Sequence, residues 1–277
     1  MTAHQFAVIG NPIAHSLSPQ IHQAFATQFG HNIQYQAHCL SVVEWQQQLE
    51  QLLHHGLKGF NVTVPFKEKV WQWVKNKSQR AHAAQAVNTV LIEEDGLTYG
   101  ENTDGIGLCR DLLHNHQLNL QGKHILILGA GGAAKGVILP LLATGPAQIT
   151  ICNRTEKKAL DLVNQFRSSG NIDSIKPHTT STQYYDLIIN ASSASLNRTL
   201  PSMPNIVIDN NTVLYDMMYG KAMPYFLQWG KQQGIHTLID GLGMLVEQAA
   251  EAYQLWHGVR PETTKLLSQL RYDLSMH

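Results

Sequence analysis

Residues 124–145 read HILILGAGGAAKGVILPLLATG, and this stretch decides the fold. The apolar run 125–128 is typical of a buried strand, and the apolar segment that follows the glycines is typical of a helix. Between them, Gly129, Gly131 and Ala134 form a G-x-G-x-x-A pattern. In that context the first glycine permits a tight turn, the second lets the backbone approach a pyrophosphate, and the alanine allows close helix–strand packing. The stretch therefore predicts a dinucleotide-binding βαβ unit.

The end of the next predicted strand, TICNRTEKK (150–158), indicates which dinucleotide is bound. Sites that prefer NAD place Asp or Glu about 20 residues after the glycines, where it binds the ribose 2′-hydroxyl. This chain has Asn153 there, followed by Arg154, Thr155 and two lysines. Amides and hydroxyls donate hydrogen bonds to a 2′-phosphate, and a guanidinium adds a charged fork. The pattern predicts NADP; the alternative is a basic first helical turn that faces solvent.

Short apolar runs alternate with helical patterns along most of the chain, which indicates an α/β fold with a mainly parallel sheet. Two β-like runs flank Asp95-Gly96, a hairpin signal. A fresh strand-and-helix series begins near Gly122. We therefore expect an N-terminal α/β substrate domain, residues 1–103 plus 241–277, and a Rossmann-type NADP-binding domain, residues 104–240. The C-terminal helices are expected to pack back on the first domain.

The composition excludes several classes of function. Among the 277 residues, 20 basic side chains balance 20 acidic ones, so neither nucleic acid nor an anionic membrane is expected as a partner. The longest apolar runs fall short of the roughly 20 residues that span a bilayer, which predicts a cytoplasmic protein. Cys39, Cys109 and Cys152 lie in apolar segments and are predicted to be buried, reduced thiols. The 15 histidines lack metal-ligand spacing, so no metal is expected and most are predicted at the surface.

Polar side chains cluster at the ends of predicted elements in the first domain. They are Ser16, Ser18, Asn61, Thr63, Lys67, Asn88 and Asp104. Ligands of parallel sheets collect at the carboxyl ends of the strands, and this mixture of groups suits a small polyhydroxylated acid. Each residue has a simpler interpretation: Ser18 as a helix N-cap, Asn88 as a turn residue, Asp104 as another N-cap, and Lys67 as a surface lysine. Their joint occurrence beside a dinucleotide domain favours a substrate site.

Several motifs together resemble the shikimate dehydrogenase family over essentially the whole chain. They are GNPIAHSLSP, NVTVPFK, AVNT, GENTDG, GAGGAAKG, NRT and DGLGML followed by QAA. The resemblance implies reversible NADP-dependent reduction of 3-dehydroshikimate to shikimate, in chorismate and aromatic amino acid biosynthesis. It also implies a small-molecule substrate and a monomer or homodimer.

The resemblance also implies residue roles. Matches to substrate-binding positions are Ser16, Ser18, Asn61, Thr63, Asn88, Tyr219 and Gln248. Matches to cofactor-binding positions are Gly129, Ala130, Gly131, Gly132, Ala133, Asn153, Arg154, Thr155, Lys158, Met217 and Gly241. Lys67 and Asp104 match the catalytic pair. The chain departs from the family pattern at Ser195, where glycine is common, and at Pro224, where threonine is often found.

Lys67 and Asp104 fit a chemical need of the implied reaction. Hydride transfer to a ketone leaves an alkoxide, so a proton donor must lie within hydrogen-bond reach of that oxygen. Burial lowers the pKa of a lysine and a nearby carboxylate raises it, so Lys67 is either the proton shuttle or the electrostatic anchor of the oxygen. Asp104 is expected to orient it. Two rival functions are a broader, NAD-using quinate/shikimate dehydrogenase and a non-catalytic sensor of the same metabolites.

Overall fold

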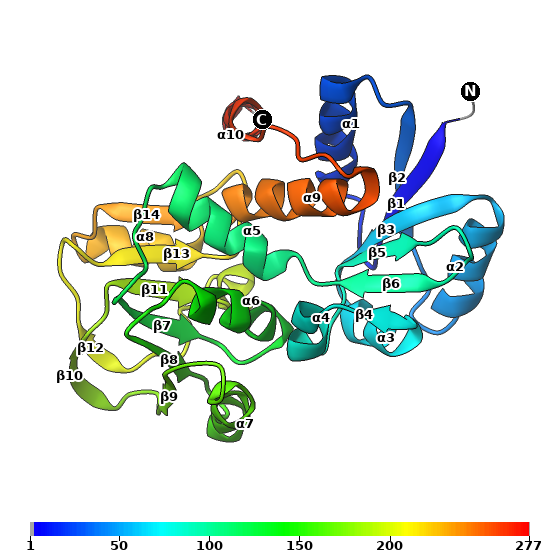
Figure 1. The fold of residues 1–277 in the computed structure, drawn as a ribbon. Helices are drawn as coiled ribbons and strands as arrows, with labels where there is room; N and C mark the ends of the chain where they lie inside the picture. Colours follow the sequence, from blue (N-terminus) through cyan, green and yellow to red (C-terminus); the bar gives the residue numbers. More distant parts are fainter. Residues whose placement is uncertain (1–2, 277) are drawn as a thin grey trace. The chain divides into compact units, whose positions relative to one another are not determined.

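The computed structural model describes residues 3–276, which form two compact units. The first unit comprises the chain up to Gly107 together with Val246–Leu266. The second comprises Leu108–Leu245 together with the chain from Leu267 onward. Both have the mixed α/β architecture that the sequence predicts, and each is described below by itself (Figure 1).

The first unit contains a six-stranded sheet of order β2-β1-β3-β5-β6-β4. Its strands are β1 (His4–Gly10), β2 (Ile33–Cys39), β3 (Leu57–Val62), β4 (Asn76–Lys77), β5 (Thr89–Ile92) and β6 (Thr98–Glu101). Strands β1, β2 and β3 are parallel, whereas β5 is antiparallel to both β3 and β6. The β5–β6 hairpin turns at Asp95-Gly96, as predicted. The carboxyl ends of β1, β3 and β6 therefore meet the start of β5 at one end of the sheet.

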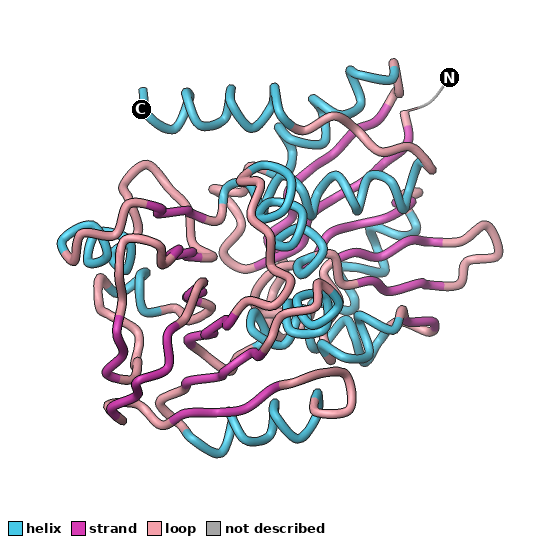
Figure 2. Tube along the Cα trace, turned by 60° about the vertical axis from the view of Figure 1, so that its left-hand side comes forward, coloured by secondary structure: helices cyan, strands magenta, loops and turns pink. Residues whose placement is uncertain are grey.

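Helices cover both faces of this sheet (Figures 1 and 2). They are α1 (Ser18–Phe29), α2 (Trp45–His54), α3 (Lys67–Trp73), α4 (Gln79–Ala84) and most of α9 (Leu242–His257). On one face Phe6 of β1 stacks on Trp256 of α9, with ring centroids 4.8 Å apart. On the other face Leu49 of α2 joins Ile9 and Phe60 in the buried core. The alternation of side chains along β1 divides the core between the two faces.

The second unit contains a fully parallel six-stranded sheet of order β14-β13-β11-β7-β8-β9. Its strands are β7 (His124–Leu128), β8 (Gln148–Cys152), β9 (Ile172–Ile175), β11 (Leu187–Asn190), β13 (Val213–Asp216) and β14 (Thr237–Asp240). Numbered in chain order, these six strands follow 3-2-1-4-5-6, which is the Rossmann order. Strands β10 (Thr180–Tyr184) and β12 (Asn205–Val207) form a separate parallel pair.

The connections of the second unit are mostly helical (Figure 2). The helices are α6 (Gly132–Ala143), α7 (Glu156–Phe166), α8 (Tyr225–Gln232), the 3₁₀ turn η2 (Ala194–Asn197) and most of α10 (Thr264–Met276). Helix α5 (Asp104–Arg110) continues into a π-helical turn, η1 (Asp111–Asn115). The contacts of residues 267–276 group them with this unit, and Arg271 of α10 binds Asp240 Oδ2 at 2.6 Å.

Three local expectations are corrected by the structure. Ser18 is the first residue of α1 rather than its N-cap, because the helix begins one residue earlier than the capping pattern suggests. Cys39 is exposed because it ends the edge strand β2, whereas burial of Cys109 and Cys152 raises the pKa of each thiol to about 12. His22 is fully buried instead of lying at the surface. Across residues 3–276, no helix has the length and apolar character needed to cross a membrane.

Candidate substrate and cofactor sites

Two loops lie against each other at the carboxyl ends of β1 and β3. The Thr63 N–H donates to the Ile9 carbonyl at 2.9 Å, and the Asn11 N–H donates to the Val64 carbonyl at 3.0 Å. Gly10 makes this approach feasible, because a Cβ on that residue would lie within van der Waals overlap of the Thr63 side chain. The loop that carries the predicted serines is thereby held beside the loop that leads to Lys67.

Lys67, Asp104 and Asn88 form one hydrogen-bonded group. Lys67 Nζ lies 2.6 Å from Asp104 Oδ2, and Asn88 Nδ2 donates to Asp104 Oδ1 at 2.7 Å. Asp104 and Asn88 are buried, whereas Lys67 is partly exposed. The first residue of α3 supplies the lysine, the segment before β5 the amide, and the first residue of α5 the carboxylate. The Asp104 carboxylate is thus held by both of its oxygens, with the lysine ammonium on its more open side.

Gln248 of α9 extends this group. Its Oε1 accepts hydrogen bonds from Asn88 Nδ2 and from the Thr103 hydroxyl, each at 3.3 Å. Thr103 also donates its backbone N–H to Asn88 Oδ1 at 2.9 Å. This last bond fixes which end of the Asn88 amide faces Asp104, because only the oxygen can accept from a backbone N–H.

Both the oxygen and the nitrogen of the Asn61 side-chain amide make hydrogen bonds within the protein. Its Oδ1 accepts from the Tyr35 hydroxyl at 2.7 Å, and its Nδ2 donates to the Asn88 carbonyl at 3.1 Å and to Thr89 Oγ1 at 2.9 Å. The Thr89 hydroxyl then donates to Asn88 Oδ1 at 3.0 Å. Asn61 is therefore joined through Thr89 to the Lys67–Asp104–Asn88 group.

Two of the hydroxyl-bearing residues, Ser16 and Thr63, are partly exposed, whereas Ser18 is buried. Ser16 Oγ accepts from the Ser18 N–H at 3.3 Å, and the buried Ser18 side chain bonds to the Tyr35 hydroxyl. The structure thus brings together all the predicted substrate and catalytic residues of the first unit. The sequence does not predict that Tyr35 and Thr89 belong to this cluster. The signals it offers are the apolar–polar alternation of IQYQAHC for Tyr35 and the position next to Asn88 for Thr89.

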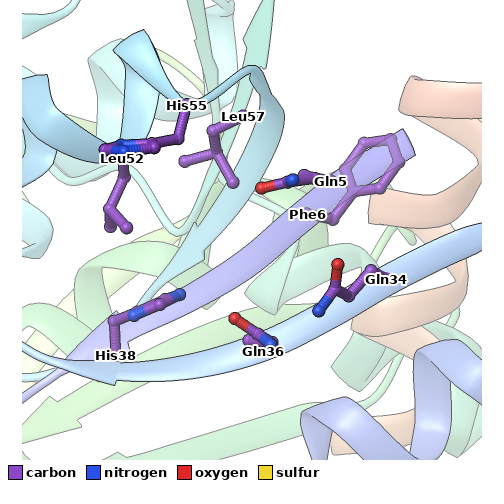
Figure 3. A pocket seen from close by; sticks show the side chains of 8 residues that line it. All are labelled: Gln5, Phe6, Gln34, Gln36, His38, Leu52, His55 and Leu57. Atoms are coloured by element: carbon purple, nitrogen blue, oxygen red, sulfur yellow. The ribbon is translucent and has the colours of Figure 1, made fainter. Parts of the chain in front are cut away.

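A polar hollow of about 330 Å³ lies elsewhere in the first unit (Figure 3). Its lining residues are Gln5, Phe6, Gln34, Gln36, His38, Leu52, His55 and Leu57. They come from β1, β2, α2 and the start of β3, and none of them belongs to the predicted substrate cluster. Burial lowers the pKa of His38 at this hollow. The hollow is therefore a separate feature of the unit.

The glycine-rich turn of the second unit is suited to a pyrophosphate. Gly129 has φ +119°, which disfavours any side chain, and its Cβ would meet the Ala191 backbone at 3.1 Å. Gly131 has an ordinary extended backbone, and a Cβ there would meet no described atom within 4 Å. Protein packing does not require a glycine at this position, whereas close approach of a ligand does. Helix α6 begins at Gly132 without a side-chain cap, so its first N–H groups face the same turn.

The residues predicted to hold a 2′-phosphate follow β8. Arg154, Thr155 and Lys158 are exposed, and Asn153 Nδ2 donates to the Thr155 carbonyl at 2.9 Å. The neighbouring acidic residue, Glu156, has its carboxylate 3.0 Å from Lys176 Nζ. This surface pair leaves the first turn of α7 predominantly basic toward an anion. The donor set therefore fits the phosphorylated ribose of NADP.

The other predicted cofactor residues of this unit lie at the ends of β13 and β14. Gly241 approaches the Met217 backbone so closely that a Cβ would overlap its carbonyl, and the Gly241 N–H donates to the Met218 carbonyl at 3.0 Å. Tyr219 is partly buried, which raises the pKa of its hydroxyl. Folding thus places Met217 and Gly241 in contact within this unit.

The two departures from the family pattern are accommodated locally. Ser195 Oγ donates to Asp216 Oδ2 at 2.6 Å, beside Asn190 Nδ2 at 2.9 Å. Burial raises the pKa of Asp216, and these two hydrogen bonds oppose that rise. Pro224 is buried and precedes the first residue of α8, a position that needs no backbone N–H. Over the described chain, no three His, Cys, Asp or Glu side chains converge as a metal site would require.

Comparisons with known proteins agree with these geometries. Models of three domains match the chain in order: the shikimate dehydrogenase substrate binding domain at residues 8–90, shikimate / quinate 5-dehydrogenase at residues 111–218, and the shikimate 5'-dehydrogenase C-terminal domain at residues 241–271. A shikimate dehydrogenase (NADP(+)) of Nitrosomonas europaea is 48% identical over 269 residues, 97% of each chain.

Solved structures give the same result. An Ael1 enzyme from Pseudomonas putida superposes with a TM-score of 0.88 at 38% identity, covering 97% of this chain and 98% of that one. Shikimate 5-dehydrogenase from Thermus thermophilus, solved in complex with NADP(H) and shikimate, superposes with a TM-score of 0.83 at 28% identity, again covering 97% and 98%.

Proposed function

This chain belongs to the shikimate dehydrogenase family, and we propose that it catalyses the reversible NADP-dependent reduction of 3-dehydroshikimate to shikimate. It is then an oxidoreductase of chorismate and aromatic amino acid biosynthesis. The proposal assigns residues 1–103 and 241–277 to substrate binding and residues 104–240 to NADP binding. A cytoplasmic location and a monomeric or homodimeric state remain predictions.

The Lys67–Asp104–Asn88 group is the single observation that carries the proposal. An ammonium 2.6 Å from a carboxylate keeps two further N–H donors that can meet a substrate oxygen. Because Asn88 holds the other carboxylate oxygen, Asp104 keeps its orientation when the lysine moves. Such a preset pair lowers the reorganisation that a proton transfer requires.

The chemistry at the reacting carbon is divided between protein and cofactor. When held by the glycine-rich turn, NADP would supply the hydride acceptor for shikimate and, in its reduced form, the hydride for 3-dehydroshikimate. In the oxidation, the hydroxyl proton leaves as the hydride departs; neutral Lys67 takes that proton, or charged Lys67 stabilises the oxygen while water takes it. Asp104 orients the lysine nitrogen and accepts a hydrogen bond from a neighbouring ring hydroxyl. The pH dependence of kcat in the wild-type protein separates the two roles of Lys67.

The remaining residues bind and orient. The hydroxyls of Ser16 and Thr63 are suited to the substrate carboxylate, because each can donate one hydrogen bond to it, and Ser18, whose hydroxyl bonds to Tyr35, is proposed to contact the substrate beside them. Tyr219 is proposed to contact the substrate, and Met217 and Gly241 the nicotinamide. The turn Gly129–Ala133 is proposed to hold the pyrophosphate, and Asn153, Arg154, Thr155 and Lys158 the 2′-phosphate.

The test is a turnover assay with shikimate and either NADP⁺ or NAD⁺, followed by the absorbance of the reduced nicotinamide. The expected result is turnover with NADP⁺ and a much lower kcat/KM with NAD⁺. Turnover of quinate with NAD⁺ at a comparable rate would instead support the broader quinate/shikimate dehydrogenase. Tight shikimate binding by calorimetry without turnover with either cofactor would support the sensor and contradict the enzyme.

A further inference from the structure

Tyr35 is a buried side chain to which the sequence pattern assigns no role. It lies on β2, and its ring stacks on His22 of α1 with centroids 4.3 Å apart and an interplanar angle of 5°. Trp256 of α9 lies beyond it at 6.3 Å. Burial raises the pKa of Tyr35 well above its usual value, so the hydroxyl keeps its proton at all working pH values. Ring packing therefore sets the position of one hydroxyl that always has a proton to donate.

The hydroxyl of Tyr35 lies between two predicted substrate residues. The Ser18 side chain donates a hydrogen bond to it, which opposes the burial effect on the Tyr35 pKa. Tyr35 then donates its own proton to Asn61 Oδ1 at 2.7 Å. Each residue therefore donates a hydrogen bond to the next, from Ser18 to Tyr35 and from Tyr35 to Asn61.

The direction continues from Asn61 to the proposed catalytic pair. Asn61 Nδ2 must face the Asn88 carbonyl, because that carbonyl can only accept, and its second proton goes to Thr89 Oγ1. Thr89 in turn donates to Asn88 Oδ1, and Asn88 Nδ2 donates to Asp104. Both amide protons of Asn61 are therefore used within the protein, so Asn61 can meet a ligand only as an acceptor, through the carbonyl oxygen that Tyr35 and His22 also approach.

We propose that Tyr35 is a positioning residue of the substrate site, whose hydroxyl orients Ser18 and Asn61 together and leaves Asn61 as an acceptor for a substrate hydroxyl. This inference rests on the proposed function and deepens it, because the one proton of the Ser18 hydroxyl is used on Tyr35, so Ser18 and Asn61 both accept from substrate hydroxyls and the carboxylate of shikimate is left to Ser16 and Thr63. An amide oxygen facing the carboxylate would repel it, so the same geometry excludes Asn61 as a carboxylate ligand.

The first experiment replaces Tyr35 by Phe, which keeps the ring stacked on His22 and removes only the hydroxyl. Loss of one buried hydrogen-bond donor is expected to raise the KM for shikimate about tenfold, with kcat reduced less than about threefold and the KM for NADP⁺ unchanged. Tyr253→Phe is the matched control. Tyr253 lies in the same unit, and its hydroxyl bonds to His31 Nδ1 at 2.6 Å, away from the substrate cluster. Its removal is expected to leave the KM for shikimate unchanged.

A double-mutant cycle separates positioning from general destabilisation. If Tyr35 acts through Ser18, Tyr35→Phe in a Ser18→Ala background should raise the KM for shikimate only about threefold. In a Thr63→Ala background, where no bond to Tyr35 is shared, the full increase of about tenfold is expected. Additive effects in both backgrounds would overturn the proposal.

Failure of this inference can be distinguished from failure of the proposed function. Wild-type protein that does not turn over shikimate contradicts the function itself. Wild-type turnover together with an unchanged KM in Tyr35→Phe, and a drop in melting temperature equal to that of Tyr253→Phe, leaves the function intact and reduces Tyr35 to a packing residue.

Discussion

The proposed substrate side and the proposed cofactor side of this protein are built in opposite ways. In the first unit, Asn61, Asn88 and Asp104 are 6%, 3% and 8% exposed, and each is held by at least two hydrogen bonds to other parts of the chain. In the second unit, Arg154, which precedes α7, and Lys158 in the first turn of that helix are both exposed to solvent. The substrate side is therefore assembled by folding, whereas the 2′-phosphate side depends on exposed charge.

Because of this difference, substitutions on the two sides are expected to affect stability and ligand affinity differently. A buried, hydrogen-bonded residue carries stability and ligand geometry together, because its removal leaves partners unsatisfied. An exposed cation makes few bonds that folding needs, so its removal changes ligand affinity without changing stability. Substitutions on the two sides test whether the contrast holds.

The largest effect is expected from Lys67→Ala. Removing the group that meets the reacting oxygen should lower kcat by roughly a thousandfold while changing the KM for shikimate much less. Lys69→Ala is the matched control, because Lys69 lies two residues along the same helix and donates to the Val42 carbonyl. Steady-state kinetics of both variants provide the measurement. An equal loss in kcat for the two lysines would contradict a specific role for Lys67.

Asn88→Ala should affect folding and catalysis together. The substitution removes the donor to Asp104 and the acceptor of the Thr103 N–H, so the free energy of unfolding should fall by about 3 kcal/mol. Urea denaturation measures this loss, and kcat/KM for shikimate should fall with it. If the variant has normal stability but low activity, the Lys67–Asp104–Asn88 group contributes to catalysis without contributing to folding, which would contradict the contrast between the two sides.

His22 predicts a pH dependence of stability on the buried side. Burial lowers the pKa of His22 to about 3, whereas an unfolded histidine titrates near 6.5. Below pH 6.5 the unfolded chain binds a proton that the folded chain does not. The free energy of unfolding therefore decreases as the pH is lowered, and His22 accounts for about 1.5 kcal/mol of that decrease between pH 6.5 and pH 5. His257, whose pKa burial lowers to about 4, adds to the trend.

Denaturation at several pH values measures the contribution of His22. His22→Phe keeps an aromatic ring against Tyr35 and should remove about 1.5 kcal/mol of this dependence. The exposed His236→Phe serves as control and should leave the dependence unchanged. An identical pH profile in wild type and His22→Phe would show that His22 binds protons equally in the folded and unfolded states.

The smallest effect is expected from Arg154→Ala on the exposed side. Loss of a charged hydrogen-bond donor should raise the KM for NADP⁺ on the order of tenfold, leave use of NAD⁺ nearly unchanged, and leave the melting temperature unchanged. Lys157→Ala, also exposed in α7 and outside the proposed clasp, is the control. Parallel losses with both cofactors would contradict the assignment of Arg154 to the 2′-phosphate.

Local patterns predicted the elements of both units better than their ends. The glycine turn after β7, the Asp95-Gly96 hairpin and the alternation of strands with helices depend on residues close in sequence, and the structure confirms each of them. The exposure of Cys39 depends on β2 being an edge strand, which no local pattern reveals. The grouping of residues 267–276 with the second unit depends likewise on contacts such as Arg271 with Asp240.

The sequence by itself determined which chemical groups are present and near which strand ends they stand, because strand periodicity, turn residues and motif spacing are local. Only the tertiary structure decided that Tyr35, Asn61, Thr89, Asn88 and Asp104 form one continuous chain of donors and acceptors. That outcome depends on strand register, since the pairing of Asn61 with Thr89 and of Thr89 with Glu101 aligns segments far apart in the chain. A register shift of one residue would turn these side chains to the opposite face.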